Sequence, residues 1–215
     1  MHGSYAPKGL CRTYPNLLTY EGVLGMEQGA RCKPENSNWL PFIRNAVGPM
    51  DFTPGSMFSA QPEDNCSTGA NPMGTGTRAY QMALYVVFES PLQMLADNPV
   101  LYRREHPCTE FLAAVPTTWD SLRVLRAACG REVVVARRKG DKWYVGGITN
   151  DRPYTTEIAL DFLPAGRTFT MTSFEDGVNA DLQATDYRKR VREVDASTVV
   201  KVEMVRNGGW AAVIE

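Results

Sequence analysis

A change in the spacing of apolar residues near residue 129 constrains the fold of this chain most. From residue 132 onward, apolar and polar residues alternate, as in strands that bury one face. Residues 139–142, Lys-Gly-Asp-Lys, separate two such runs and favour a tight hairpin turn. Several short strands with turn signals between them, and no helix, are typical of an antiparallel β-sandwich. We expect strands at 132–138, 142–148, 158–162, 167–174, 188–194, 198–204 and 210–214.

The residues before 129 follow a different pattern. Tyr80, Leu84 and Val87 have helical spacing, and most residues between them are also apolar, which predicts a helix buried on two sides. Pro91 must end or kink this helix near Ser90, because proline lacks an amide hydrogen. Other expected elements are a short strand at 41–47, an exposed loop at 59–76, a helical piece at 92–96 and a helix at 122–128. The shift in pattern divides the chain into domains at 1–128 and 129–215.

Composition excludes several classes of protein. The 215 residues are 43% hydrophobic, which is enough for a core, and carry a net charge of −1 with acids and bases intermixed. This balance does not indicate nucleic acid or an anionic membrane as a partner. No stretch approaches the roughly 20 apolar residues of a membrane span, and no signal peptide is visible. Five cysteines without a Cys-x-x-Cys pair, and two histidines, disfavour zinc, while Cys32 and Cys66 are candidates for a disulfide.

Two carboxylates, Glu21 and Glu27, are the main candidates for chemistry. Six residues apart, they share no helix face, and on a flat strand they would lie about 20 Å from each other. Gly22 and Gly25 lie between them and permit a folded loop that brings both into one pocket. Two converging carboxylates suit glycoside hydrolysis, a hard cation such as calcium, or both. The alternative is a surface loop whose acids are solvated.

Eight motifs in order resemble glycoside hydrolase family 97 and cover nearly the whole chain. They fit most poorly at about 28–39 and 59–77. The motifs are His2-Gly3, GLCRTYPN (9–16), EGVLGME (21–27), GPMDFTPG (48–55), SPLQMLAD (90–97), PTTWD (116–120), ARRKG (136–140) and DGVNA (176–180). The family's enzymes are calcium-dependent α-glucosidases and α-galactosidases with an N-terminal β-supersandwich, a central (β/α)8 barrel and a C-terminal β-sandwich.

The resemblance implies a fold and a site. Residues 1–128 would be the later part of the (β/α)8 TIM barrel, and residues 129–215 would be the antiparallel β-sandwich. The fold class is therefore an α/β part followed by an all-β part. Glu27 matches the acid that protonates the departing glycosidic oxygen, Glu21 and Glu27 match calcium ligands, and His2 matches a position that contacts the sugar. A bound dication favours an ionised carboxylate, so calcium at Glu27 opposes its role as an acid. The resemblance also implies a periplasmic or secreted enzyme whose remaining N-terminal domains are partners of this chain.

Gly3 distinguishes between the retaining and inverting members that the resemblance brings in. Inverting members carry a glutamate directly after this histidine. Retaining members have a non-acidic residue there and use an aspartate nucleophile on an earlier strand, upstream of Met1. The resemblance thus implies that the chain is part of a retaining enzyme acting on α-galactosides rather than α-glucosides. This chain would supply Glu27 but lack the nucleophile, and it would be inactive alone. The alternative is a non-catalytic remnant or carbohydrate-binding fragment. Arg12 and Asp51 are expected to orient loops.

Overall fold

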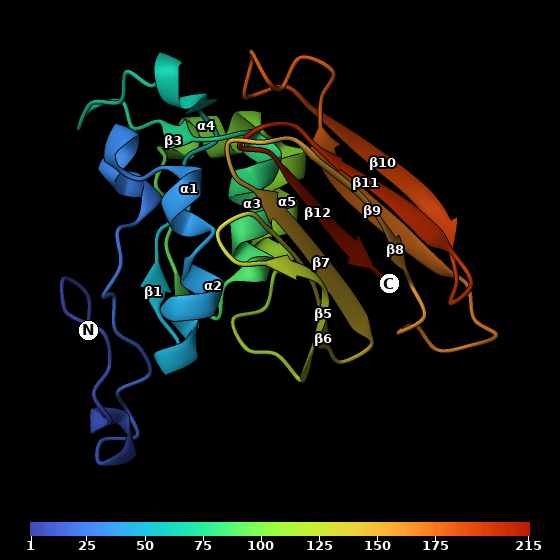
Figure 1. The fold of residues 1–215 in the computed structure, drawn as a ribbon, viewed down its shortest axis with the longest axis horizontal. Coiled ribbons are helices and arrows are strands. Elements are labelled where there is room, and N and C mark those ends of the chain that lie inside the picture. The colour runs from blue at the N-terminus through green and yellow to red at the C-terminus, as the bar shows by residue number, and fades with distance from the viewer.

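The computed structural model describes residues 1–215, with a helical N-terminal region on one side of a large antiparallel sheet (Figure 1). The helices are α1 (Pro34–Ser37), α2 (Leu40–Ile43), α3 (Arg78–Val87), α4 (Pro99–Arg104) and α5 (His106–Ala114). Single 3₁₀ segments are η1 (Leu10–Arg12), η2 (Met26–Arg31), η3 (Asn45–Val47) and η4 (Pro62–Asp64). Short parallel pairs join β1 (Asp51–Phe52) to β4 (Leu92–Gln93) and β2 (Ser59–Ala60) to β3 (Gly74–Thr75). None of the helices has the length and apolar character to cross a bilayer.

Eight longer strands form the C-terminal region. A six-stranded antiparallel sheet has the order β10-β9-β12-β7-β6-β5, and β11 pairs with β8 in a separate ribbon. Six of the seven strands expected from the alternating pattern lie at the expected positions, and the seventh, expected at 158–162, is shifted to residues 154–159 and followed by a turn. The β6–β7 hairpin turns at Gly140, whose φ of 58° favours glycine. Their bounds are β5 (Ser121–Ala128), β6 (Glu132–Lys139), β7 (Lys142–Thr149), β8 (Tyr154–Ala159), β9 (Phe169–Asp176), β10 (Tyr187–Val194), β11 (Val199–Met204) and β12 (Gly209–Ile214).

The central strands β6, β7 and β12 of the six-stranded sheet are buried on both faces, whereas the edge strands β5 and β10 are largely exposed. Val133 and Val135 of β6 contribute to a core shared with α3 and α5, while Val134 and Ala136 contribute to a second core shared with the β8–β11 ribbon. This division follows from the geometry of a strand, in which successive side chains point to opposite faces. The sheet is therefore the middle layer of three, between the N-terminal region and the ribbon.

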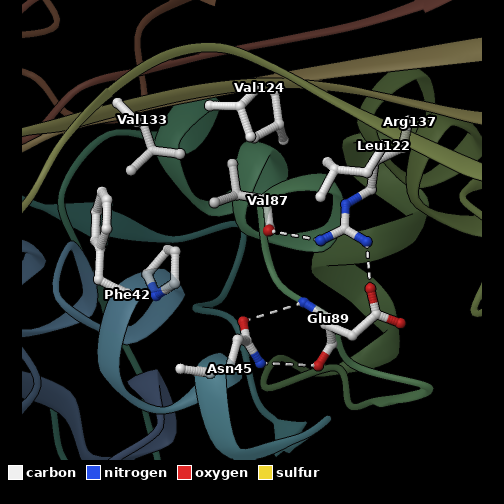
Figure 2. Close-up of a pocket in the computed structure, with 12 residues that line it drawn as sticks. Phe42, Asn45, Val87, Glu89, Leu122, Val124, Val133 and Arg137 are labelled. Atoms are coloured by element: carbon white, nitrogen blue, oxygen red, sulfur yellow. Dashed lines mark hydrogen bonds and ion pairs between the residues drawn. The ribbon is translucent and has the colours of Figure 1, made fainter.

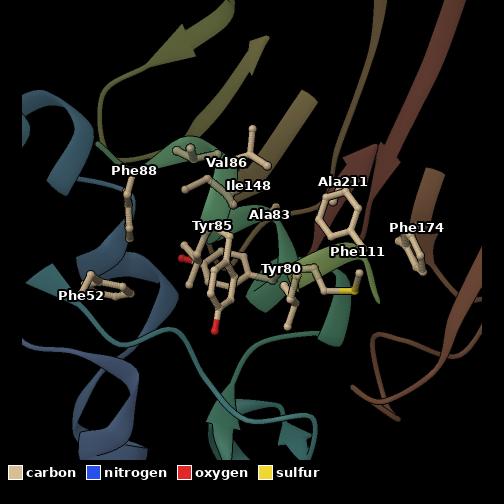
Figure 3. Close-up of a cluster of buried hydrophobic side chains, with 14 of the residues drawn as sticks. Phe52, Tyr80, Ala83, Tyr85, Val86, Phe88, Phe111, Ile148, Phe174 and Ala211 are labelled. Carbon is tan, nitrogen blue, oxygen red and sulfur yellow. The ribbon is translucent and has the colours of Figure 1, made fainter. Parts of the chain in front are cut away.

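Helix α3 is the centre of the first core (Figure 3). Its N-cap is Thr77, whose hydroxyl accepts a hydrogen bond from the amide of Tyr80 at 3.0 Å. All ten residues of the helix are buried, and the ring of Phe88, which follows it, meets Phe52 edge-on at 4.7 Å. The predicted helix buried on two sides is confirmed, and it ends at Val87, a few residues before Pro91.

Three short elements and the disulfide differ from expectation. Residues 122–128 form strand β5 rather than a helix, so the sheet begins before residue 129. Residues 41–47 belong to α2 and η3 rather than a strand, with Pro41 in the first turn of α2, where proline is tolerated. In 92–96 the structure has the short strand β4 in place of a helix. Cys32 is buried against the carbonyl of Leu24, and Cys66 is exposed, so both thiols are free.

The N-terminal region contains parallel segments connected by a helix. Strand β1 leads through α3 to β4, which pairs with β1 in parallel, and Tyr20 forms a parallel bridge with Met50 just before β1. A strand–helix–strand connection of this kind is the repeating unit of a (β/α)8 barrel. The fold is mixed α/β with mostly antiparallel sheets, and the partial barrel remains a prediction.

Asp176 connects the helical region to the sheet. Its carboxylate accepts hydrogen bonds from the Thr77 hydroxyl at 2.6 Å and from the amides of Val205 at 3.0 Å and Gly209 at 3.1 Å. Burial raises the pKa of Asp176 to about 7, against the lowering effect of these hydrogen bonds and of the charge of Arg188. The folded chain therefore holds a proton on this group at pH values where the unfolded chain does not.

The raised pKa of Asp176 predicts that its contribution to the free energy of unfolding decreases as pH rises. The contribution of Asp176 is fully present below about pH 4 and is lost as pH rises to about 7, because the raised pKa favours the protonated form in the folded state. A shift of this size corresponds to about 4 kcal/mol. Urea denaturation of the wild type and of Asp176→Asn, which has no titrating group there, should show the wild type losing stability relative to the variant between pH 4 and 8. A difference that is constant over this range would contradict the prediction.

Candidate functional site

Three backbone segments come together around the predicted site. The amide of Glu21 donates to the carbonyl of Met1 at 3.0 Å, and that of Gly22 to Ser4 at 2.8 Å, so residues 1–4 run beside 20–22. On the other side, the amide of Asp51 donates to the carbonyl of Tyr20 at 3.0 Å. His2, Glu21 and Asp51 are therefore carried on neighbouring segments.

His2 lies between two carboxylates. Its Nδ1 donates to Asp51 Oδ2 at 2.8 Å, and its Nε2 lies 3.6 Å from Glu21 Oε1. The hydrogen bond to Asp51, together with the charges of Glu21, Asp51 and Glu27, raises the pKa of His2 above its ordinary value although burial lowers it. About half of the His2 side chain is exposed, so the ring is accessible to a ligand.

Glu21 is held by the backbone at Gly3. The amide of Gly3 donates to Glu21 Oε2 at 2.6 Å, and Gly3 takes a φ of 64°. Space around the missing Cβ of Gly3 is open, so the absence of a side chain there is not enforced by packing. Residue 3 thus contributes a hydrogen-bond donor to the site, whereas a glutamate at this position would add a third carboxylate.

Glu27 lies in η2, two residues after the structurally constrained Gly25. Its carboxylate folds back over Gly25, where an added Cβ would lie 2.1 Å from Glu27 Oε2. The preceding residue, Met26, is buried, and its amide donates to the carbonyl of Thr53 at 2.8 Å, which anchors the segment. Glu27 Oε2 itself is buried and has no hydrogen-bond partner. Buried polar atoms are normally paired, so this oxygen indicates a ligand or proton donor that completes the site.

The structure brings together all three predicted site residues. The ligating atoms of His2, Glu21 and Glu27 lie within 4.8 Å of one another. The loop predicted from Gly22 and Gly25 is confirmed, since Gly22 has a φ of 53° and approaches the backbone of Ala6 too closely for a side chain. Two carboxylates, one of them with an unpaired oxygen, fit a hard cation, and calcium takes six to eight oxygen ligands. A metal bound here would therefore take further oxygens from water, substrate or other groups.

Asp51 and Arg12, which were both expected to orient loops, differ in their contacts. Asp51 is fully buried and fixes the His2 ring by accepting from Nδ1, which leaves Nε2 toward Glu21. This contact joins residues 49 positions apart, so no local pattern could have revealed it. Arg12 is exposed in η1 and forms no ion pair.

A groove elsewhere on the molecule does not include these residues (Figure 2). Its two charged side chains, Arg137 and Glu89, form an ion pair with each other, and Arg137 also donates to the carbonyl of Val87 at 3.1 Å. Asn45 exchanges two hydrogen bonds with the backbone of Glu89 at 3.1 and 3.2 Å. Its remaining walls are mainly apolar, from α2, β5 and β6. The convergent carboxylates lie outside this groove.

Comparisons with known proteins agree on one family. The family described as glycosyl-hydrolase 97 C-terminal, oligomerisation, matches residues 118–215. A retaining alpha-galactosidase of Bacteroides thetaiotaomicron is 43% identical over 100% of this chain, and a probable retaining alpha-galactosidase of Streptomyces bingchenggensis is 34% identical over 99%. A glycoside hydrolase family 97 enzyme from Pseudoalteromonas sp. strain K8, solved with acarbose, has a TM-score of 0.87 and 37% identity over the whole chain. The chain spans 33% and 30% of the two curated relatives and 34% of the solved structure.

Proposed function

The chain belongs to glycoside hydrolase family 97, and we propose that it supplies the acid/base residue of a retaining α-galactosidase. The observation that carries this proposal is the convergence of Glu27, with its buried unpaired oxygen, on Glu21 and His2. It is supported by 43% identity over the full chain to a retaining alpha-galactosidase. Hydrolysis of α-glycosides is the chemistry that these relatives share.

In the proposed reaction Glu27 acts twice. Its carboxyl group first donates a proton to the glycosidic oxygen as a nucleophile attacks the anomeric carbon and the C–O bond breaks. The resulting Glu27 carboxylate then takes a proton from the water that displaces the nucleophile, and this restores both groups. A retaining enzyme needs the nucleophile about 5–5.5 Å from the acid/base. We assign this nucleophile to an aspartate outside residues 1–215.

His2 and Gly3 support the choice of substrate and stereochemistry. The half-exposed His2 ring, oriented by Asp51, is placed to contact a sugar hydroxyl. Gly3 gives the site a backbone donor rather than a carboxylate, so the water-activating base of an inverting enzyme is absent from this position. The glycine at position 3 therefore favours retention, and similarity to retaining alpha-galactosidases favours α-galactosides as substrates ahead of α-glucosides.

We also propose that Glu21 and Glu27 hold a calcium ion. When bound, the ion would offset the mutual repulsion of the two carboxylates and orient them toward the sugar. The chain offers only two carboxylate side chains and His2 at this position, fewer than the six to eight oxygens that calcium takes. Calcium binding by this chain is therefore expected to be weak.

Calcium titration calorimetry tests this expectation. The wild type should bind with a dissociation constant above about 10 µM, and Glu21→Gln or Glu27→Gln should weaken binding further. Glu63→Gln is the matched control, because Glu63 pairs with Arg206 away from the site and should leave the affinity unchanged. Submicromolar binding, or binding insensitive to both site substitutions, would contradict the calcium proposal.

The enzymatic proposal is tested in a chimaera. Residues 1–215 replace the matching third of the Bacteroides thetaiotaomicron alpha-galactosidase, and release of nitrophenol from an aryl α-galactoside is followed. We expect turnover by the chimaera and none by residues 1–215 alone. A folded chimaera without turnover would favour a non-catalytic role, whereas turnover by the chain alone would show that its own residues provide the nucleophile.

A further inference from the structure

Arg44 is a buried charge without a carboxylate partner. It directly follows α2, and only 5% of its surface is exposed. Its guanidinium donates to four backbone carbonyls: Tyr20 at 2.9 Å, Glu21 at 3.3 Å, Gly48 at 2.9 Å and Pro49 at 3.2 Å. It forms no ion pair. A buried arginine whose donors are all directed at main-chain oxygens holds backbone segments in place.

The two segments held by Arg44 are the ones that carry the carboxylates around His2. One segment contains Tyr20 and Glu21, and the other leads through residues 48–50 into Asp51. The carbonyl of Tyr20 accepts from both Arg44 and the amide of Asp51, so it is the point where the segments meet. The guanidinium group of Arg44 thus holds the backbone segments of Glu21 and Asp51 at a fixed distance from each other.

Electrostatics link Arg44 to the same pair. Asp51 is fully buried, and its negative charge opposes the effect of burial, which lowers the pKa of Arg44. The positive charge of Arg44 in turn offsets part of the cost of burying the Asp51 carboxylate. That carboxylate orients His2 through Nδ1. Arg44 therefore acts on the ring through Asp51, without touching it.

We propose that Arg44 is a positioning residue of the site: it fixes the spacing of Glu21 and Asp51, and hence the orientation of His2 between them. The importance of this geometry for a ligand rests on the proposed function. Lysine is a poor substitute, because a single ammonium cannot reach four carbonyls in two directions as the planar guanidinium does. Arg44→Lys therefore retains the positive charge but loses most of the hydrogen bonds that join the two backbone segments.

The experiment compares Arg44→Lys and Arg44→Gln with Arg137→Gln in the full 215-residue chain. Arg137 is a matched control, since it is 4% exposed and also donates to a backbone carbonyl, at Val87, away from the site. The first readout is the long-range ¹H–¹⁵N NMR spectrum of the His2 ring, which reports the nitrogen that carries the proton. The second is calcium titration by calorimetry.

At a pH high enough for the His2 ring to be neutral, we expect the wild type and Arg137→Gln to show a single His2 form with the proton on Nδ1. Arg44→Lys should show a mixture of forms and a calcium affinity about tenfold weaker, the range typical of residues that orient ligands. Folded Arg44 variants with the wild-type His2 spectrum would overturn the inference. So would unfolding of both Arg44 variants while Arg137→Gln stays folded, because that shows a purely structural role. Absence of calcium binding by the wild type would count against the calcium proposal alone, since the His2 spectrum is read without metal.

Discussion

Replacing Gly209 by alanine is expected to lower the stability of the chain by more than about 4 kcal/mol or to prevent folding. A Cβ at Gly209 would lie 2.4 Å from the Cα of Tyr80 and 2.5 Å from its amide nitrogen. Both are backbone atoms of α3, so no side-chain rotation relieves the overlap. Strand β12 would have to separate from the helix that forms the centre of the first core.

A second glycine of the sheet serves as the control. At Gly147 of β7 an added Cβ would meet Met204 Sδ at 3.3 Å and Val134 Cγ2 at 3.4 Å, and both side chains can adjust. Gly147→Ala should therefore change stability by less than about 1 kcal/mol. Urea denaturation of both variants gives the comparison. Equal effects would show that close contact between α3 and β12 is not what requires glycine at 209.

The Glu27→Gln substitution in the chimaera is expected to reduce turnover of an α-galactoside by about 10²–10⁴-fold. An amide can neither donate a proton to the glycosidic oxygen nor accept one from water, so both steps are slowed. An activated leaving group should restore the first step and leave the second slow, since the displacement by water still lacks a base. Glu35→Gln, an exposed residue of α1, is the control and should keep full activity. Turnover by Glu27→Gln equal to that of the control would exclude Glu27 as the acid/base.

Six strands after residue 129 were predictable because each follows the strand period and is bounded by turn residues, whereas β8 begins at Tyr154, ahead of the expected residue 158. Strand β5 was missed for a physical reason. A β-bulge between Val124 and Arg126 shifts its register, so its apolar residues depart from simple alternation and also fit a helix. The strand expected at 41–47 was wrong because the turn at Gly48 can end a helix as well as a strand.

The carboxylates of the site were predictable, and the residues that orient them were not. Glu21 and Glu27 lie six residues apart with glycines between them, and the loop that these glycines permit is the one observed. Asp51 and Arg44 act through contacts that join distant segments, such as the 24-residue separation between Arg44 and Tyr20. Such contacts depend on the pairing of parallel segments, which a single sequence does not specify. Family resemblance identified the motif containing Asp51 without indicating its hydrogen bond to His2.

Azide rescue tests the central claim most directly. Azide attacks a glycosyl–enzyme intermediate without needing a base, so it should restore turnover of an activated aryl α-galactoside by the Glu27→Ala chimaera. The expected product, followed by proton NMR, is the α-galactosyl azide, because two inversions give net retention. Formation of the β-azide would show that Glu27 is instead the nucleophile or that the enzyme inverts. Undiminished hydrolysis by Glu27→Ala without azide would contradict any acid/base role for Glu27.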